Sequence, residues 1–211
     1  IPTMYGLTKR ELSVFKRLNT PTKIQDFLDT LPINFEKRGE TYMSPRRVIR
    51  ENKAHCLEGA VFAALALHLQ GEKPLLMDLK SFPADDDHVV TLYKKNGYWG
   101  AISKTNHATL RFRDPIYKTV RELALSYFHE YFMNDTGTKV LKSYSAPFNL
   151  TKLGTKWATA EEELYSVVDA LENAPHFPLI PKENKRHIRK ADSMERKAGT
   201  LIEWQSKNPR T

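Results

Sequence analysis

Residues 56–70 read CLEGAVFAALALHLQ, and eleven of these fifteen residues are apolar. Its apolar residues occupy nearly every side of a helical wheel, which is typical of a helix buried on all sides. Gly71 follows directly and is a natural C-terminal cap. The sequence therefore predicts a central helix from about Cys56 to Gln70. Four small residues would let strands pack closely against it: Gly59, Ala60, Ala63 and Ala64.

The segment after Gly71 predicts an antiparallel sheet. Asn96-Gly97 is the strongest short hairpin signal, and it separates the β-branched run at 88–93 from a return strand over 98–103. Further short strands are expected over 74–79 and 109–113. An antiparallel sheet next to a buried helix, with helices before and after it, belongs to the α+β class.

Helix start signals frame this core. Thr20-Pro21 and Ser44-Pro45 each place an N-cap before a proline at the first helical position, and the first of these helices ends before Pro32. Thr159 and Glu162 form a capping box. We expect helices over 118–132, 159–172 and 191–205, and an irregular segment over 134–156 with one short strand at most. Residues 1–156 would form the core domain, and 157–211 a helical, basic C-terminal extension.

Composition and cysteine usage indicate a globular protein of the cytoplasm. The 211 residues are 40% hydrophobic and 27% charged, and no apolar run is long enough to span a bilayer. The first residues lack the pattern of a signal peptide. A single cysteine excludes an internal disulfide and a zinc site built on several cysteines.

The net charge of +8 is concentrated near the C-terminus. Between Lys182 and Thr211 there are nine Lys/Arg against four Asp/Glu. Such a segment is usually a solvated tail, and its alternative role is weak, non-specific binding of nucleic acid. The most prominent acidic run, Asp85 to Asp87, lacks the ligand spacing of a calcium loop, so we expect a solvated loop and no metal.

Cys56 is the candidate nucleophile. The thiolate is the reactive form of cysteine, and a helix N-terminus lowers the pKa of a thiol because its unpaired N–H groups favour negative charge. Cys56 lies where the buried helix is expected to begin. The same N–H groups would form part of an oxyanion hole. The competing interpretation is an inert core cysteine, which is common in apolar helices.

His88 is the candidate base. A cysteine nucleophile needs an imidazole within hydrogen-bond reach, and His88 opens the strand expected to pack on the central helix. His55 adjoins Cys56 in sequence but is expected to point away from it. The remaining histidines have no special setting: His68, His107, His129, His176 and His187.

Residues 44–104 resemble the core of the transglutaminase-like superfamily, which has the papain-like fold. The resemblance rests on Cys56-Leu57-Glu58-Gly59-Ala60, then His88-Val89-Val90, the turn Asn96-Gly97, and Trp99. It covers about a third of the chain. The family includes protein-crosslinking enzymes, bacterial cysteine proteases and peptide N-glycanases, all built on a Cys-His-Asp arrangement. The resemblance thus implies that Cys56 and His88 form a catalytic pair.

The third member of that arrangement is where this chain departs from the family. The family has an aspartate four residues after the tryptophan, and Ser103 stands there. Asn106 and Asp114 are the stronger candidates to orient His88, with Ser103 behind them. With a two-residue turn, Lys95 pairs with Tyr98, and Ser103 then shares the face of His88 while Asn106 points away; a one-residue bulge would reverse this.

The sequence therefore predicts a cysteine-dependent acyl-transfer enzyme, with hydrolysis of a peptide or protein amide favoured over crosslinking. This chemistry needs no cofactor. Two alternatives stay open. One is a transglutaminase-like binding module that has lost activity, consistent with Ser103. The other is a nucleic-acid-associated protein acting through the basic tail.

Overall fold

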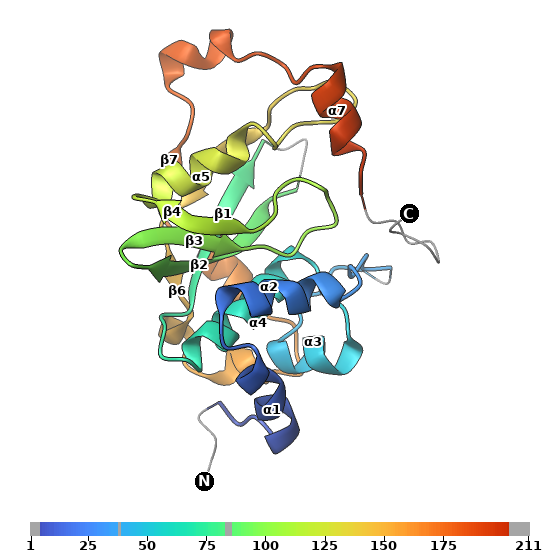
Figure 1. Ribbon diagram of the computed structural model, residues 1–211, viewed down its shortest axis with the longest axis vertical. Helices are drawn as coiled ribbons and strands as arrows, with labels where there is room; N and C mark the ends of the chain where they lie inside the picture. Colours follow the sequence, from blue (N-terminus) through green and yellow to red (C-terminus); the bar gives the residue numbers. More distant parts are fainter. Residues whose placement is uncertain (1–4, 38, 83–85, 203–211) are drawn as a thin grey trace.

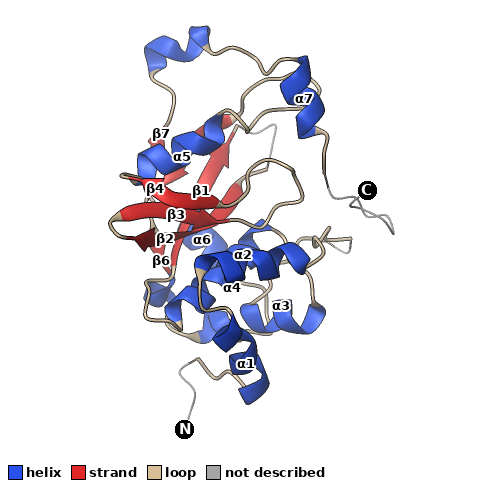
Figure 2. Ribbon diagram, in the orientation of Figure 1, coloured by secondary structure: helices blue, strands red, loops and turns tan. Residues whose placement is uncertain are grey.

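An antiparallel sheet runs through the middle of the molecule and has helices on both faces (Figure 2). The structure is a computed structural model that describes residues 5–37, 39–82 and 86–202. Six of the seven strands follow the order β4-β3-β2-β1-β5-β7, and the seventh, β6, pairs with β1. Their bounds are β1 Leu75–Ser81, β2 His88–Lys95, β3 Tyr98–Ile102, β4 Arg113–Tyr117, β5 Leu141–Ser145, β6 Phe148–Asn149 and β7 His176–Pro178.

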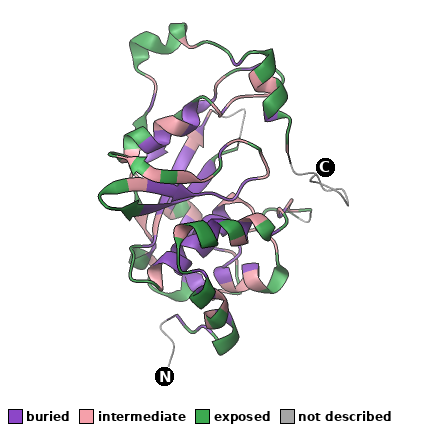
Figure 3. Cartoon of the chain, in the orientation of Figure 1, coloured by how far each residue is buried: buried purple, intermediate pink, exposed green. Residues whose placement is uncertain are grey.

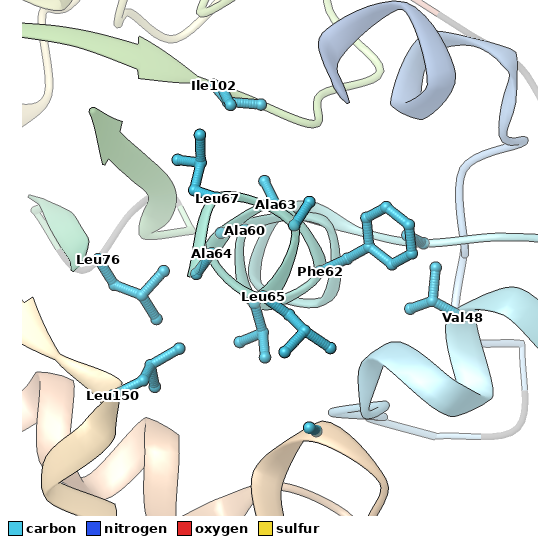
Figure 4. Packing of buried hydrophobic residues seen from close by; sticks show 14 of the residues in the cluster. Val48, Ala60, Phe62, Ala63, Ala64, Leu65, Leu67, Leu76, Ile102 and Leu150 are labelled. Carbon is cyan, nitrogen blue, oxygen red and sulfur yellow. The ribbon is translucent and has the colours of Figure 1, made fainter. Parts of the chain in front are cut away.

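Helix α4, Cys56–His68, is the buried helix that the sequence predicts. All eleven of its residues from Leu57 to Leu67 are buried. Its side chains point outward in every direction, toward Val48 on one side and Leu76 on another (Figure 4). Thr91 of β2 donates a 2.5 Å hydrogen bond to the Ala60 carbonyl, so sheet and helix are in close contact.

Four further helices pack on the α4 side of the sheet. They are α1 Lys9–Arg17, α2 Pro21–Thr30, α3 Pro45–Glu51 and α6 Tyr165–Glu172 (Figure 2). The starts of α2 and α3 confirm the Thr20 and Ser44 caps. Helix α1 was not expected. Thr8 and Glu11 form a capping box there that supplies its start signal.

The opposite face of the sheet is covered by α5, Val120–Phe128. Alternation along β1 divides its side chains between two cores: Leu76 faces α4, whereas Met77 and Leu79 face α5. Figure 3 shows buried residues on both sides of the sheet. The last described helix, α7, spans Ser193–Gly199 and lies beyond the α5 face in Figure 1.

The hairpin register agrees with the sequence prediction. Asn96 and Gly97 have φ of 51° and 89°, as a two-residue turn with two left-handed positions requires. Lys95 pairs with Tyr98, and the pairing continues without a bulge to Thr91 and Ile102.

Several predicted elements differ from the structure. The strand expected over 109–113 is absent, because Leu110 has φ of 60° and turns the chain; β4 begins only at Arg113. Thr119 is the N-cap of α5, and this helix spans only Val120–Phe128 of the expected 118–132. Thr159 is not the N-cap of a helix: its hydroxyl donates to the Tyr5 carbonyl, and α6 begins at Tyr165. The segment 134–156, expected to be irregular, contributes β5 and β6.

Residues on both sides of the expected boundary at 156/157 share one core. Trp157, Val167 and Leu171 belong to the same cluster as α4, and β7 pairs with β5 in the central sheet. The segment after 156 is therefore built into the body of the fold at least as far as β7. The helix expected over 191–205 is α7, and residues 203–205 lie outside the described residues. No helix among the described residues has the length and apolar character of a membrane span.

Candidate active site

Cys56 lies at the N-terminal end of α4, in the wall of a cavity of about 730 Å³. It is half-buried and is the first residue of the helix. His55 and His88 line the same cavity, as does the chain segment from Lys104 to His107 that follows β3. The structure thus brings the candidate nucleophile and the candidate base to one cavity.

His55 is the N-cap of α4, and its ring does not point away from Cys56. Nδ1 of His55 accepts the Leu57 N–H at 3.2 Å and lies 3.9 Å from the Cys56 sulfur. Nε2 donates to the Thr41 carbonyl at 2.6 Å. The expectation that His55 turns away is wrong because a capping side chain folds back over the first helical turn, where the next side chain begins.

The surroundings of Cys56 favour its thiolate. Burial raises the pKa of the thiol, but hydrogen bonds and charge from His55 and His88 outweigh it, and the pKa lies well below its ordinary value. Burial likewise lowers the pKa of His55, while the hydrogen bond and charge of Cys56 and the charge of Glu58 raise it to about 9. Nδ1 cannot accept the Leu57 N–H and hold a proton at once. The neutral His55 ring therefore caps the helix, whereas the protonated ring pairs with the Cys56 thiolate.

Ser103 holds the ring of His88. The two side chains are 2.8 Å apart, from Nε2 to Oγ, and Ser103 Oγ is also 2.6 Å from the Leu110 carbonyl. A carbonyl only accepts, so the serine proton belongs to that contact and the serine oxygen accepts from His88 Nε2–H. In a neutral imidazole this leaves Nδ1 unprotonated, which is the tautomer that a base needs.

The structure does not bring Asn106 or Asp114 to the His88 ring. Asn106 lines the cavity, and Asp114 is exposed on β4. Neither makes a hydrogen bond to His88 among the contacts of the described residues. Both were ranked above Ser103, and the register of the hairpin gives the physical reason for the opposite outcome: without a bulge, Ser103 shares the face of His88.

The backbone that carries Ser103 is fixed from two directions. Gln25 of α2 accepts from the Ser103 N–H at 2.9 Å and donates to the Ser103 carbonyl at 2.8 Å. The buried Lys104 ammonium donates to the carbonyl of Leu31, the C-cap of α2. On the other side, a Cβ on Gly59 would lie 2.4 Å from Lys104 Cβ. Only glycine at this place lets the segment lie directly on α4.

Glu58 connects Cys56 to the loop before α3. Its carboxylate is fully buried and accepts from His55 N–H at 2.9 Å, Thr41 Oγ at 2.8 Å and Met43 N–H at 3.1 Å. Asn34 Nδ2 adds a contact at 3.1 Å. Sequence reasoning missed both His55 and Glu58. A cap residue followed three positions later by glutamate is the capping-box signal that could have revealed them.

The acidic run singled out in the sequence contributes Asp86 and Asp87 to the cavity lining, whereas the basic run at 182–187 contributes no residue to it. Asp87 is exposed and pairs with Lys80 at 3.1 Å, and Asp85 is not among the described residues. In the described ranges no three His, Cys, Asp or Glu side chains are grouped as metal ligands would be. The basic run at 182–187 forms an exposed turn of 3₁₀ helix, and Trp204 lies beyond the described residues.

The geometry amounts to a thiol at a helix N-terminus, with the His55 ring 3.9 Å from its sulfur and with His88 lining the same cavity, held by Ser103 in the tautomer of a base. Such a thiol can attack an electrophilic carbon, and its helix terminus can stabilise the negative charge that develops. Comparison with known proteins adds no further evidence, because no protein-family model and no curated protein matches the chain.

Proposed function

We propose that this protein is a cysteine-dependent acyl-transfer enzyme, most simply a hydrolase of amide bonds in peptides or proteins, with a transglutaminase-like, papain-like core. One observation carries the proposal: Cys56 begins α4 at the wall of a cavity, with His55 Nδ1 3.9 Å from its sulfur and with His88, held by Ser103, lining the same cavity. A cysteine that only fills a core gains nothing from such a setting, and burial alone would raise its pKa.

In the first step the Cys56 thiolate attacks the substrate carbonyl carbon and forms a carbon–sulfur bond. The oxygen takes up the negative charge. The Cys56 N–H, at the first helical position, has no partner within the helix and is available to this oxygen. His88, whose Nδ1 took the thiol proton when the thiolate formed, then gives this proton to the leaving amine as the carbon–nitrogen bond breaks. A thioester remains on Cys56.

In the second step a water molecule attacks the thioester. His88 removes a proton from this water, the carbon–sulfur bond breaks, and the carboxylic acid and the Cys56 thiolate are released. Ser103 takes no part in bond changes. It accepts from His88 Nε2–H throughout and keeps the opposite nitrogen toward the sulfur. Hydrolysis is proposed over crosslinking because the proposal needs only one substrate site, the cavity beside Cys56.

The test is acylation of Cys56, the single cysteine of the chain. A p-nitrophenyl ester should release a burst of nitrophenol equal to the enzyme concentration and add the acyl mass to Cys56 at about pH 6, where an ordinary thiol is mostly protonated. His88→Ala should lower the burst rate by about 10²-fold or more because the general base is lost. A wild-type protein that acylates only after denaturant is added would contradict the proposal.

A specific observation favours one second function, a binding module with the same fold. Ser103 offers His88 no negative charge, whereas the family arrangement places a carboxylate there. Without that charge an imidazolium is less stabilised, and turnover could be lost while the cavity is kept. A stoichiometric burst without any later turnover, over a series of esters and peptides, would favour this alternative.

A further inference from the structure

The residues that follow α7, Thr200 to Ile202, lie against the chain beyond β3 as a short extended strand. The Leu201 carbonyl accepts the Ala108 N–H at 2.8 Å, and Ile202 forms an antiparallel β-bridge with His107. In Figure 1 the chain leaves α7 and passes beside the loop that joins β3 to β4. These three residues are called the 200–202 segment below, and the backbone at His107 and Ala108 is called the pairing edge.

The pairing edge borders the cavity that contains Cys56. His107 lines this cavity together with Cys56 and His88, and so does Gly199, the residue directly before the 200–202 segment. Ser103, which holds the His88 ring at 2.8 Å, lies only four residues before His107. The 200–202 segment therefore occupies backbone positions beside the proposed base.

Backbone and polar contacts hold this part of the chain in place. The Arg196 side chain of α7 donates to the Asn134 carbonyl at 2.7 Å, and the Asn134 amide donates to the Gly199 carbonyl at 2.8 Å. Neither hydrophobic cluster of the described residues includes a residue of α7, and Leu201 is exposed while Ile202 is half-buried. Water replaces such polar contacts at a small net cost, so the segment can leave without opening a core.

Strand pairing of this kind does not depend on sequence. A backbone N–H at an edge accepts any extended chain that presents a carbonyl, and peptides are commonly recognised by adding a strand in this way. The pairing edge therefore has the chemistry of a site for an extended peptide, and its present occupant belongs to the same chain.

We propose that an extended peptide substrate binds to the pairing edge and displaces the 200–202 segment, which acts as an internal competitor in the free protein. This inference rests on the proposed function only in calling the peptide a substrate. Ala108 N–H donates to a carbonyl of the peptide, and an aliphatic side chain of the peptide replaces Ile202 opposite His107. Because a short connection gives the segment an effective concentration of about 1 mM or more, weakly binding peptides are excluded from the cavity.

The first experiment compares two truncated chains, one ending at Thr200 and one ending at Ile202. The probe is the fluorescein-labelled peptide Ala-Gly-Thr-Leu-Ile-Glu, the sequence of residues 198–203, and its binding is read by fluorescence anisotropy. The chain ending at Thr200 should bind the probe about fivefold or more tightly than wild type, since a competing hydrogen bond is lost. The chain ending at Ile202 keeps the competitor and should bind like wild type.

A control peptide tests the backbone contact. It carries an ester in place of the Leu-Ile amide, so its side chains are unchanged and the carbonyl at this place is a weaker acceptor. It should bind the chain ending at Thr200 about threefold or more weakly than the probe does.

The second experiment uses the full chain. Arg196→Ala removes a contact that holds α7, whereas Lys197→Ala removes an exposed cation of the same helix. Both variants lose one positive charge, and only Arg196→Ala should bind the probe more tightly than wild type. Hydrogen exchange followed by NMR should show a slow Ala108 amide in wild type, a faster one in the chain ending at Thr200, and a slow one again when the probe is added.

Equal affinity of the two truncated chains for the probe would overturn the inference. So would an Ala108 amide that stays protected without the 200–202 segment, or a probe that does not bind the chain ending at Thr200 at about 1 mM. Probe binding as expected, in a protein whose Cys56 is not acylated by a p-nitrophenyl ester, would instead refute the proposed function and support the peptide site.

Discussion

His55 permits a test that separates two roles of one side chain, because asparagine can replace it as a helix cap but cannot replace it as an imidazole. His55→Asn keeps an acceptor for the Leu57 N–H and removes the ring that lies 3.9 Å from the Cys56 sulfur. His55→Ala removes both. In both variants the pKa of Cys56 should rise, because a hydrogen bond and a nearby charge that lower it are lost.

The two variants should differ in stability above about pH 9, where the His55 ring is neutral and accepts the Leu57 N–H. His55→Ala loses the cap, at about 1 kcal/mol, and the 2.6 Å hydrogen bond to the Thr41 carbonyl, at about 1 kcal/mol more. For a chain of this length the total of about 2 kcal/mol corresponds to a fall in Tm of about 4–8 °C. His55→Asn loses only the Thr41 contact, so its Tm should fall by about 2–4 °C.

The assay is the rate of iodoacetamide labelling of Cys56 from about pH 5 to 9, read by mass spectrometry, together with thermal unfolding of each variant. The pH–rate curves of the two variants should move upward in pH by the same amount, although their Tm values differ. The reasoning is refuted if His55→Asn keeps the wild-type curve. It is also refuted if the shift of the pH–rate curve is larger for the less stable variant and not equal for the two variants, both of which lack the imidazole.

Three further predictions concern the same part of the fold. Ser103→Ala leaves the His88 Nε2–H and the Leu110 carbonyl without a partner, so the free energy of unfolding in urea should fall by about 2 kcal/mol and iodoacetamide labelling of Cys56 at about pH 6 should slow. An unchanged labelling rate would show that another group orients His88. Gly59→Ala should lower the free energy of unfolding by about 1–3 kcal/mol, because its Cβ would lie 2.4 Å from Lys104 Cβ. Helix propensity alone predicts that alanine is stabilising here, so a stabilised variant would contradict the packing argument. The raised pKa of His55 contributes stability that is fully present below pH 6.5, the ordinary pKa of histidine, and is lost as the pH rises through about 9. In urea titrations at a series of pH values across this range, wild type should therefore lose more stability than His55→Asn.

The parts of the fold that the sequence predicted are those with strong local signals. The all-round apolar pattern of 56–70 and the Asn96-Gly97 turn each have one structural solution, and both elements are present at the expected places. Leu110 is the contrary case. Nothing in the alternating run at 109–113 indicates that a leucine adopts φ of 60°, because this conformation is imposed by contacts of its backbone with Ser103 and Glu130.

The part of the candidate site that the sequence could predict is the part that follows from the register of the hairpin. Counting from the turn places Ser103 on the face of His88, and the structure has it there. Asn106 and Asp114 were preferred for their chemistry, which carries no information on distance. His55 could not be located in this way, because a cap side chain is positioned by the helix that follows and not by periodicity.

Under the proposed function, the segment from Ser103 to Leu110 has a consequence for the energetics of the reaction. Gln25, Lys104, Gly59 and the Leu110 carbonyl fix Ser103 in the folded state, before any substrate arrives. A hydroxyl is a weaker partner for an imidazolium than a carboxylate, but a dipole that is already oriented requires no reorganisation when the ring becomes charged. The rigidity of this segment would thus compensate for the negative charge that Ser103 does not offer to His88. Mutations that loosen this segment should reduce the rate by raising the reorganisation energy, even where every polar atom of the site is retained.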